Sequence, residues 1–332
     1  MENYELVTVI IPVFNVYPYL AEAIDSVLQQ TYDNLEILII DDGSSDGSER
    51  LCDEYAKRDN RIHVVHQDNK GLSAARNLGL DMATGDVIAF LDSDDAYHPD
   101  CIRMMMSAMV REKADLVVCD YSLHHTAGKM IQRNHRLKKN QTIYSHRDAL
   151  RALADEDIDH HAWDKLYNRE LWKEIRYPVG RVYEDIDTTY RVIDLCEKVC
   201  VLGQPLYLHR RRSGSIATIC SEKNIRDSML ANWHFTSFVS RHIPDLFTED
   251  NLLRSRRAWL VRMIDYYSRL SWKEKTFKKE LKREILQFEG IEEIEKGDFP
   301  LRFACWMISK CPWLFKTLYL IHHAVRHMTW KR

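Results

Sequence analysis

The chain has 332 residues, of which 45% are apolar and 29% are charged, with 47 basic and 50 acidic side chains. This length provides for one large domain or two ordinary ones, and the near balance of charge argues against nucleic acid as the main partner. The 8 cysteines include no C-x-x-C pair, and no run of about 18 apolar residues occurs, so we expect reduced cysteines and no membrane span in a cytoplasmic protein.

The first 120 residues contain short apolar runs that alternate with helical patterns. The runs predict strands at residues 8–15, 36–42, 61–65, 86–92 and 115–120. Fully apolar strands separated by helices are typical of a parallel sheet covered on both faces, so we predict a doubly wound α/β fold. Because no basic region precedes the first run and the run soon reaches Asn15, we expect no signal peptide.

Polar residues follow several of these predicted strands at the point where each strand ends. Asn15 ends the first, Asp42 the second, and the acids of "DSDD" (92–95) the fourth. In doubly wound sheets, ligands bind outside the carboxyl ends of the strands. A single acidic strand end is also explained by helix capping, but several at one edge predict a binding site.

The stretch "VIAFLDSDD" (87–95) places three carboxylates directly behind a buried strand, where like charges repel each other. An acid–x–acid pair suits Mg²⁺ or Mn²⁺, which are held by one or two carboxylates plus substrate phosphates. The alternative is a capped helix start, because Asp95 and Asp100 flank Pro99. No G-x-G-x-x-G follows the first strand and no P-loop motif occurs, which argues against dinucleotide cofactors and P-loop chemistry.

The alternation of strands and helices stops after residue 121. Residues 128–145 are basic and predict a hairpin or loop over the sheet, and residues 160–185 are rich in aromatic side chains. From residue 225 onward the pattern is helical and basic to the end, so we predict a domain boundary near that position.

Four motifs together resemble the large family-2 inverting glycosyltransferases of the GT-A fold, of the bacterial surface-polysaccharide type. They are "PVFN" at 12–15, "DDGSSD" at 41–46, "GLSAARN" at 71–77 and "DSDD" at 92–95. The resemblance implies a Rossmann-like, mostly parallel sheet flanked by helices, with a helical C-terminal extension. It divides the chain into a GT-A domain at 1–225, with a nucleotide-sugar half at 1–120 and an acceptor half at 121–225, and a helical region at 226–332.

The resemblance also implies roles for the residues of the nucleotide-sugar half. Phe14 and its neighbours would lie under the base, Asp42 would accept a hydrogen bond from uracil, and Asp92 would bind the ribose. Asp94 would ligate Mn²⁺ or Mg²⁺. The full set expected around the UDP-sugar comprises Pro12, Phe14, Asn15, Asp42, Asn69, Lys70, Arg76, Asp92 and Ser93, with Asn69, Lys70 and Arg76 facing the base or the diphosphate. Strand ends, turns and a surface helix are the structural alternatives for these positions.

The acceptor half would supply the proton transfer. The family's base lies in a Glu-Asp pair that Glu184 and Asp185 match, and we expect Asp185 to be the base and Glu184 to orient the base or the acceptor. The alternative is an exposed helix N-terminus, which Asp185 and Asp187 would also suit. Trp163 offers a flat face for an acceptor sugar, with a core position as the alternative.

A His-Arg sequence near the end of this half would cap the metal and the diphosphate. His209 is the expected second metal ligand, and Arg210 or Arg212 the expected diphosphate ligand. The nearby "SGSI" (213–216) would belong to a loop that closes over the donor.

The C-terminal stretch 313–328 has apolar residues at spacings of three and four, with basic residues and histidines opposite. A basic amphipathic helix with aromatic residues near its ends suits the surface of an anionic membrane. We therefore expect peripheral contact at the inner face of the plasma membrane. Packing on the domain itself, or on a second subunit of a homodimer, are the alternatives.

The resemblance predicts an enzyme that moves a hexosyl or N-acetylhexosaminyl group from a UDP-sugar to a hydroxyl of a lipid-linked glycan. The product would be a capsular, exopolysaccharide or cell-wall glycan. One alternative is a phosphatase of the haloacid dehalogenase type, because "FLDSDD" resembles its acid–x–acid nucleophile motif. A catalytically inactive glycan-binding relative is the other.

Overall fold

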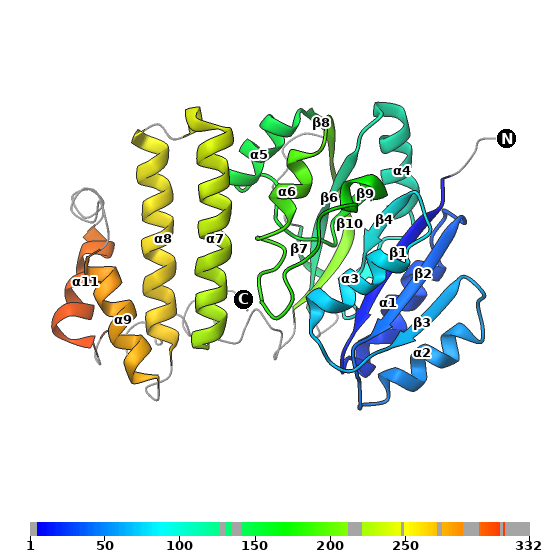
Figure 1. The fold of residues 1–332 in the computed structure, drawn as a ribbon, viewed down its shortest axis with the longest axis horizontal. Helices are drawn as coiled ribbons and strands as arrows, with labels where there is room; N and C mark the ends of the chain where they lie inside the picture. The colour runs from blue at the N-terminus through cyan, green and yellow to red at the C-terminus, as the bar shows by residue number, and fades with distance from the viewer. Residues whose placement is uncertain are drawn as a thin grey trace. The chain divides into compact units, whose positions relative to one another are not determined.

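One mixed β-sheet, built from the buried apolar runs of the sequence, organises residues up to 211 (Figure 1). The computed structural model describes residues 5–125, 130–133, 141–211, 221–246, 249–270, 274–287, 299–312 and 315. The strands within these ranges are β1 (Val7–Val13), β2 (Leu35–Asp41), β3 (Ile62–His66), β4 (Val87–Phe90), β5 (Ala96–Tyr97), β6 (Leu116–His125), β7 (Met130–Arg133), β8 (Gln141–Tyr144), β9 (Lys165–Asn168) and β10 (Val199–Arg211). The helices among and after them are α1 (Tyr17–Leu28), α2 (Ser48–Ala56), α3 (Leu72–Met82), α4 (Cys101–Glu112), α5 (His146–Ala154), α6 (Thr189–Asp194), α7 (Glu222–His242), α8 (Glu249–Arg269), α9 (Lys275–Leu286) and α11 (Phe299–Lys310).

The sheet is parallel in its first half and mixed beyond it. Its strand order is β3-β2-β1-β4-β9-β6-β10-β5, with β7 beside β6 and β8 beside β10. The pairs within β1–β4 are parallel, as is β6–β10, whereas β9 lies antiparallel between β4 and β6. The strand β7 follows β6 too closely for a crossover connection and pairs with it antiparallel, and β5 pairs antiparallel with β10. The predicted α/β fold is confirmed, and residues 128–145 add β7 and β8 to the sheet.

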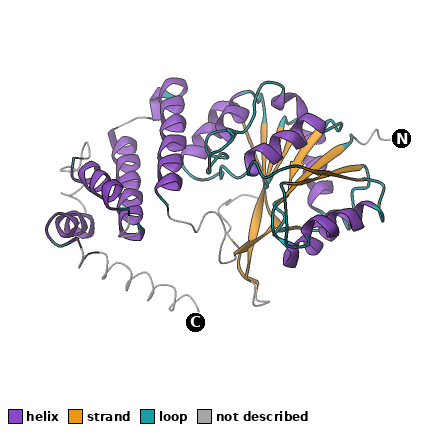
Figure 2. Cartoon of the chain, turned by 60° about the horizontal axis from the view of Figure 1, so that its bottom comes forward, coloured by secondary structure: helices purple, strands orange, loops and turns teal. Residues whose placement is uncertain are grey.

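Helices lie along both faces of this sheet (Figure 2). Val9 and Ile11 of β1 point into a core that also contains buried residues of α1 and α4. Side chains alternate along a strand, so Ile10 points to the opposite face, where α3 packs. Gly79 permits this close approach, because an added Cβ there would collide with the Ile10 side chain.

The register of the strands brings the polar strand ends together. Val13 at the end of β1 pairs with Asp41 at the end of β2, and Ile10 pairs with Phe90 at the end of β4. The residues that follow these strands therefore emerge at one edge of the sheet, as in other doubly wound folds.

The chain divides into two compact units. One comprises residues up to Ser215 together with Ala231–His242, and the other comprises Ile216–Leu230 together with the residues from Ile243 onward. The predicted boundary near residue 225 falls inside α7, whose residues are shared between the two units.

The second unit has a helical core of its own, formed by α8, α9 and α11. Leu260, Ile264, Leu281 and Ile308 are among its buried residues, and Phe315 packs into the same core. The C-terminal helical extension is thus confirmed. None of the helices in the described ranges combines the length and the apolar character that a membrane span requires. The predicted amphipathic helix at 313–328 lies, apart from Phe315, outside the described residues, as do Arg212 and the "SGSI" loop.

Candidate active site

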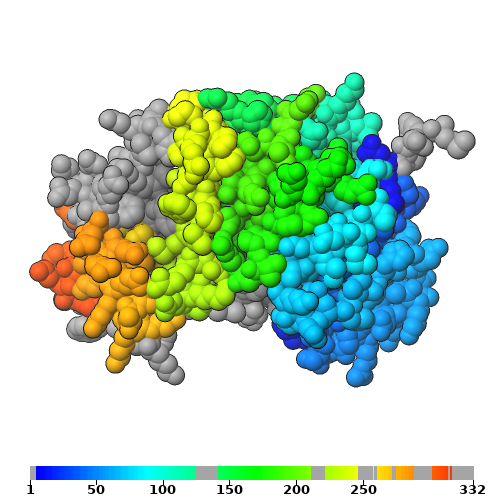
Figure 3. Space-filling model, in the orientation of Figure 1, coloured from blue at the N-terminus to red at the C-terminus, as the bar shows by residue number. Residues whose placement is uncertain are grey.

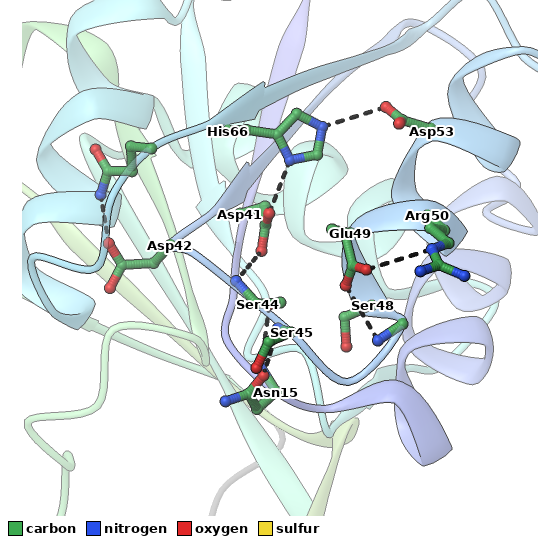
Figure 4. Close-up of polar contacts among 12 residues, drawn as sticks. Asn15, Asp41, Asp42, Ser44, Ser45, Ser48, Glu49, Arg50, Asp53 and His66 are labelled. Carbon is green, nitrogen blue, oxygen red and sulfur yellow. Dashed lines mark hydrogen bonds and ion pairs between the residues drawn. The ribbon is translucent and has the colours of Figure 1, made fainter.

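The end of β1 presents an exposed aromatic ring and an asparagine in a left-handed conformation. Phe14 is 47% exposed, and Asn15 has φ 50°. The Asn15 amide oxygen accepts the backbone N–H of Ser45 at 2.9 Å, and the Ser44 hydroxyl accepts the N–H of Asn15 at 3.1 Å (Figure 4). These bonds fasten the end of β1 to the loop after β2. Pro12, by contrast, is buried within β1.

The Asp42 carboxylate organises the loop that carries the next two expected residues. It accepts the backbone N–H groups of Lys70 and Gly71, both at 2.8 Å, and the Gln67 side-chain amide at 2.6 Å. Asn69 and Lys70 are exposed beside it. The structure therefore brings Asp42, Asn69 and Lys70 to the same edge as Asn15, with Asp42 buried as the anchor of the loop.

A buried carboxylate next to Asp42 supports this arrangement through a histidine. Asp41 lies 2.7 Å from Nδ1 of His66 and accepts the backbone N–H of Ser44 at 3.0 Å, and Nε2 of His66 lies 3.2 Å from Asp53 (Figure 4). The hydrogen bond to Asp41 raises the pKa of His66 above its usual value. The sequence prediction did not include Asp41 or His66 as functional residues; their register at the ends of β2 and β3 is the signal that links them.

The "DSDD" segment forms a turn whose last acid anchors β10. Asp95 donates its N–H to the carbonyl of Asp92 at 2.9 Å. Its buried carboxylate accepts the Tyr207 hydroxyl at 2.8 Å and the Arg210 N–H at 2.6 Å, and lies 3.2 Å from Nδ1 of His209. Burial raises the pKa of Asp95 to about 6. Asp95 was not an expected site residue, yet it brings His209 to the acidic turn.

The guanidinium of Arg210 is engaged within the protein. Its Nε donates to the carbonyl of Asp94 at 2.9 Å, and its Nη2 lies 2.6 Å from the Glu22 carboxylate. The same group sits over the Tyr19 ring, 5.3 Å from its centroid. Arg210 therefore braces the acidic turn, and the structure gives no support to its expected place on the diphosphate. Arg212, the alternative, lies outside the described residues.

The donor chemistry of the acidic turn suits a hard divalent cation. The described residues contain no group of three or more histidine, cysteine or carboxylate side chains already arranged to hold a metal ion. Mg²⁺, however, is commonly held by one or two carboxylates together with substrate phosphates, and Asp94 lies partly exposed on this turn, next to the buried Ser93. His209 is bonded through Nδ1 to Asp95, an arrangement that metal-binding histidines generally share. Asp94 and His209 are therefore compatible with the expected metal.

Arg76 lies in a place that differs from the expected one. The side chain is 3% exposed, with Nη2 at 2.9 Å from Asp92 and Nη1 at 2.6 Å from Glu184. A buried cation between two carboxylates compensates both. The Arg76 guanidinium is thus engaged within the protein, where it joins Asp92, just after β4, to Glu184, 108 residues along the chain from Arg76.

Asp185 follows directly on this ion network and remains partly exposed. Its carboxylate accepts the N–H of Ile186 at 2.8 Å. Burial raises the pKa of Asp185 to about 7, and repulsion from Glu184 adds to this effect, while Arg76 opposes it. A carboxylate whose pKa lies near neutrality is well matched to taking up a proton.

Trp163 is packed on both sides by other rings. It is 5% exposed and is stacked with His161, 4.3 Å between ring centroids, and with Tyr207 at 4.1 Å and His209 at 5.3 Å. The indole has no open face for an acceptor sugar here. The core alternative describes its position, since the stack supports the ring of His209.

Comparison with known proteins agrees with this geometry. The sequence profile described as "Glycosyl transferase family 2" matches residues 8–176. Glycosyltransferase GlyA of Streptococcus pneumoniae is 34% identical over 224 residues, which is 65% of this chain and 32% of GlyA. GlyG of the same organism is 32% identical, over 64% of this chain and 73% of GlyG. The putative glycosyltransferase EpsH of Bacillus subtilis is 34% identical, over 63% of this chain and 62% of EpsH. The match thus spans about a third of GlyA and larger shares of the other two.

Solved structures share the fold. Residues 1–349 of S. aureus TarS in complex with UDP-GlcNAc superpose with a TM-score of 0.63 at 18% identity, covering 85% of this chain and 81% of that one. The same protein in complex with UDP gives a TM-score of 0.56, covering 90% of this chain and 86% of that one.

Proposed function

The chain belongs to glycosyl transferase family 2, and from this premise we propose that it transfers a sugar from a UDP-sugar to a hydroxyl of a glycan, with inversion at the anomeric carbon. The observation that carries the proposal is the ion network in which Arg76 joins Asp92 to Glu184, beside Asp185. Asp92 lies at the strand ends, where doubly wound folds bind their ligands. The network joins it to Glu184, whose neighbour Asp185 is suited to proton uptake. The family match removes the haloacid dehalogenase alternative.

We propose that the edge formed by β1, β2 and β4 binds the UDP part of the donor. The exposed Phe14 and Asn15 offer an aromatic face and an amide to the base, and the loop held by Asp42 places Asn69 and Lys70 beside them. The UDP-GlcNAc and UDP complexes of TarS, which shares this fold, support a uridine donor.

We propose that Asp94 and His209 hold Mn²⁺ or Mg²⁺ against the donor diphosphate. When bound, the ion would neutralise the charge that develops on the departing UDP. Asp95 and Arg210 contribute by fixing the turn and β10, so that the Asp94 carboxylate and the His209 ring are held in place before the donor arrives.

We propose that Asp185 is the general base. Its carboxylate takes the proton of the acceptor hydroxyl as the hydroxyl oxygen forms its bond to the anomeric carbon. The bond from that carbon to the diphosphate oxygen breaks on the opposite face, and the electron pair leaves with UDP. The anomeric carbon passes through the oxocarbenium-like state known from glycoside hydrolysis.

We propose that the acceptor is a lipid-linked glycan of a surface or cell-wall polysaccharide. The charge of the C-terminal region supports contact with an anionic membrane, since residues 243–332 carry 18 basic and 12 acidic side chains. A basic surface near the lipid headgroups would bring the enzyme to such an acceptor.

The experiment that tests the function is a donor screen. Release of UDP from several UDP-sugars is measured with Mn²⁺, with and without membrane extracts that contain lipid-linked glycans. We expect release that depends on both one donor and the acceptor. Binding of UDP without any turnover would instead indicate an inactive glycan-binding relative, and the proposal would be rejected.

A further inference from the structure

Helix α3 holds the chain at a point eight residues before the proposed base. The Asn77 side-chain amide donates to the carbonyl of Tyr177 at 2.8 Å, and its oxygen accepts the N–H of the same residue at 2.8 Å. One side chain therefore satisfies both backbone groups of Tyr177, as a neighbouring strand would. Figure 3 shows the cyan surface that includes α3 next to the green surface of residues later in the chain.

The neighbouring residue of α3 holds the other end of the same segment. Arg76 lies 2.6 Å from the carboxylate of Glu184, the residue directly before Asp185. Its guanidinium also lies over the rings of Phe90 and Tyr177, at 5.9 and 5.4 Å from their centroids. Adjacent residues of one helix thus fix both ends of segment 177–184.

Between these two anchors the backbone takes conformations that need support. Tyr183 has φ 60°, which is unfavourable for a bulky residue, and Gly180 has φ 81°. Val179 is 60% exposed, and Arg181 in the middle of the segment pairs with Asp187 at 2.9 Å. Such a conformation persists only where the surrounding structure determines it strongly, and the two anchors at the ends of the segment contribute to that constraint.

We propose that Arg76 and Asn77 are positioning residues that fix segment 177–184 and thereby set the Asp185 carboxylate against the acceptor hydroxyl, which rests on the proposed role of Asp185 as the base. Arg76 has a second task, because its other nitrogen pairs with Asp92. The same guanidinium therefore keeps Asp92 at a fixed distance from Glu184, the residue directly before Asp185.

Removal of Arg76 should also change the proton affinity of the base. The ionisable groups that act on Asp185 are Glu184, Asp92 and Arg76, and Asp185 in turn acts on the phenols of Tyr167 and Tyr177. Arg76 lowers the pKa of Asp185, while burial and the two carboxylates raise it. Loss of the cation should therefore raise this pKa further, and a base with a higher pKa is protonated over a wider range of low pH.

The first experiment removes the Asn77 anchor and leaves the charges unchanged. In Asn77→Ala, the amide hydrogens of segment 177–184 should exchange faster with solvent. The kcat for transfer from the UDP-sugar found in the donor screen should fall by about 10- to 100-fold, because small misplacements of a reacting group cost that much. The affinity for UDP with Mn²⁺ should stay within a few-fold. Arg169→Met is the matched control. The Arg169 guanidinium donates to the carbonyls of Ala83 and Thr84, outside segment 177–184, so its loss should leave exchange, kcat and UDP affinity unchanged.

The second experiment separates the charge of Arg76 from its shape. In Arg76→Met, the acid limb of the pH profile of kcat/KM should move to higher pH, whereas Arg76→Lys should keep it near the wild-type position, with kcat still reduced. An unshifted acid limb in a folded Arg76→Met protein would overturn the role of Arg76. If Arg76→Met does not fold, the Lys variant decides: wild-type kcat with Lys, which cannot span both carboxylates in the same fork, would overturn it equally.

These results remain separable from the donor screen. Unchanged exchange and unchanged kcat in Asn77→Ala would reject the positioning role while the wild-type enzyme still transfers sugar. A wild-type protein that releases no UDP from any donor would instead reject the proposed function. The exchange measurement then still decides whether α3 holds segment 177–184.

Discussion

At the scale of single residues, a substitution of Asp185 should reduce turnover without weakening donor binding. The change Asp185→Asn keeps the shape of the side chain and removes the basic oxygen. We expect transfer to fall by about 10²- to 10⁴-fold, the usual effect of a positioned base. The affinity for UDP, measured by calorimetry with Mn²⁺, should stay within a few-fold, because a group that acts in the transition state adds little to ground-state binding.

Asp94→Ala provides the contrast, since it should lose UDP binding and turnover together. Near-normal transfer by Asp185→Asn would place the base elsewhere, with Glu184 and Asp187 as the next residues to change. A loss of UDP binding as severe as that of Asp94→Ala would place Asp185 in the donor site instead.

His66 should make part of the stability depend on pH. Its pKa is raised in the folded protein, chiefly by the hydrogen bond to Asp41. A raised pKa means that the interaction stabilises the fold below the ordinary histidine pKa of about 6.5 and that this stabilisation is lost as pH rises through the folded value. The melting temperature of His66→Gln should therefore fall further below wild type at pH 5.5 than at pH 8.5. His63→Gln, on the same strand, is the control, and an equal deficit of His66→Gln at both pH values would contradict the linkage.

The sequence identified the residues at the strand ends better than it identified their orientations. Asn15, Asp42, Asn69 and Lys70 meet at one edge, because strand ends in a parallel sheet share an edge whatever the side chains do. The direction in which Arg76 points depends on Glu184, 108 residues further along the chain, and no local pattern contains that information. Trp163 was similarly open to two positions until its stacking partners were known.

At the scale of elements, Asp95 should act on stability and Asp94 on ligand binding. Asp95→Ala would leave the Tyr207 hydroxyl and the Arg210 N–H without their acceptor, and an unsatisfied buried polar group costs about 1–3 kcal/mol. We expect a loss of that order in the free energy of unfolding, measured with urea. Asp94→Ala should cost less, because its side chain is partly exposed. Equal losses in the two variants would show that Asp95 does not anchor β10.

Apart from the short β5, the strands of the first 120 residues followed from pattern alone, whereas β9 in the next 90 residues did not. The strands β1, β2 and β4 are almost entirely buried, so their apolar runs stand out, whereas β3 at the end of the strand order is only partly buried. The strand β9 has the sequence KLYN, with the buried Lys165 donating to the carbonyls of Asp159 and His161 and to the Asp164 carboxylate. A lysine in the middle of a sheet is compensated by tertiary contacts, and hydrophobic periodicity cannot reveal such a strand.

At the scale of the whole molecule, donor binding should require a divalent cation. UDP with Mn²⁺ should raise the melting temperature, because a ligand bound only to the folded protein at 100 times its Kd adds about 2.7 kcal/mol of stability. A chelator should remove most of this shift. An equal rise in melting temperature with and without metal would show that Asp94 and His209 do not form a metal site.

Removal of the far C-terminus should affect membrane binding more than donor binding. The cut should follow Lys316, because Phe315 belongs to the core of the second unit. The truncated protein should lose binding to vesicles that contain anionic lipid and keep its affinity for UDP. Vesicle binding that is unchanged would place the membrane contact elsewhere, and a change of oligomeric state on truncation would assign the removed stretch to a subunit interface.

The ion network around Arg76 also determines when the proposed catalytic centre can form during synthesis of the chain. The partners Asp92 and Glu184 lie 16 and 108 residues along the chain from Arg76, and Tyr177 lies 100 residues from Asn77. During synthesis the strands β1 to β4 leave the ribosome first, with the edge of β4 still lacking β9 and the guanidinium lacking its second carboxylate. Contacts of such long sequence separation form slowly, because the loop between the partners must close first. The residues up to Asp92 are therefore synthesised well before Glu184 and Asp185, and the proposed catalytic centre is complete only when the chain has been made beyond His209.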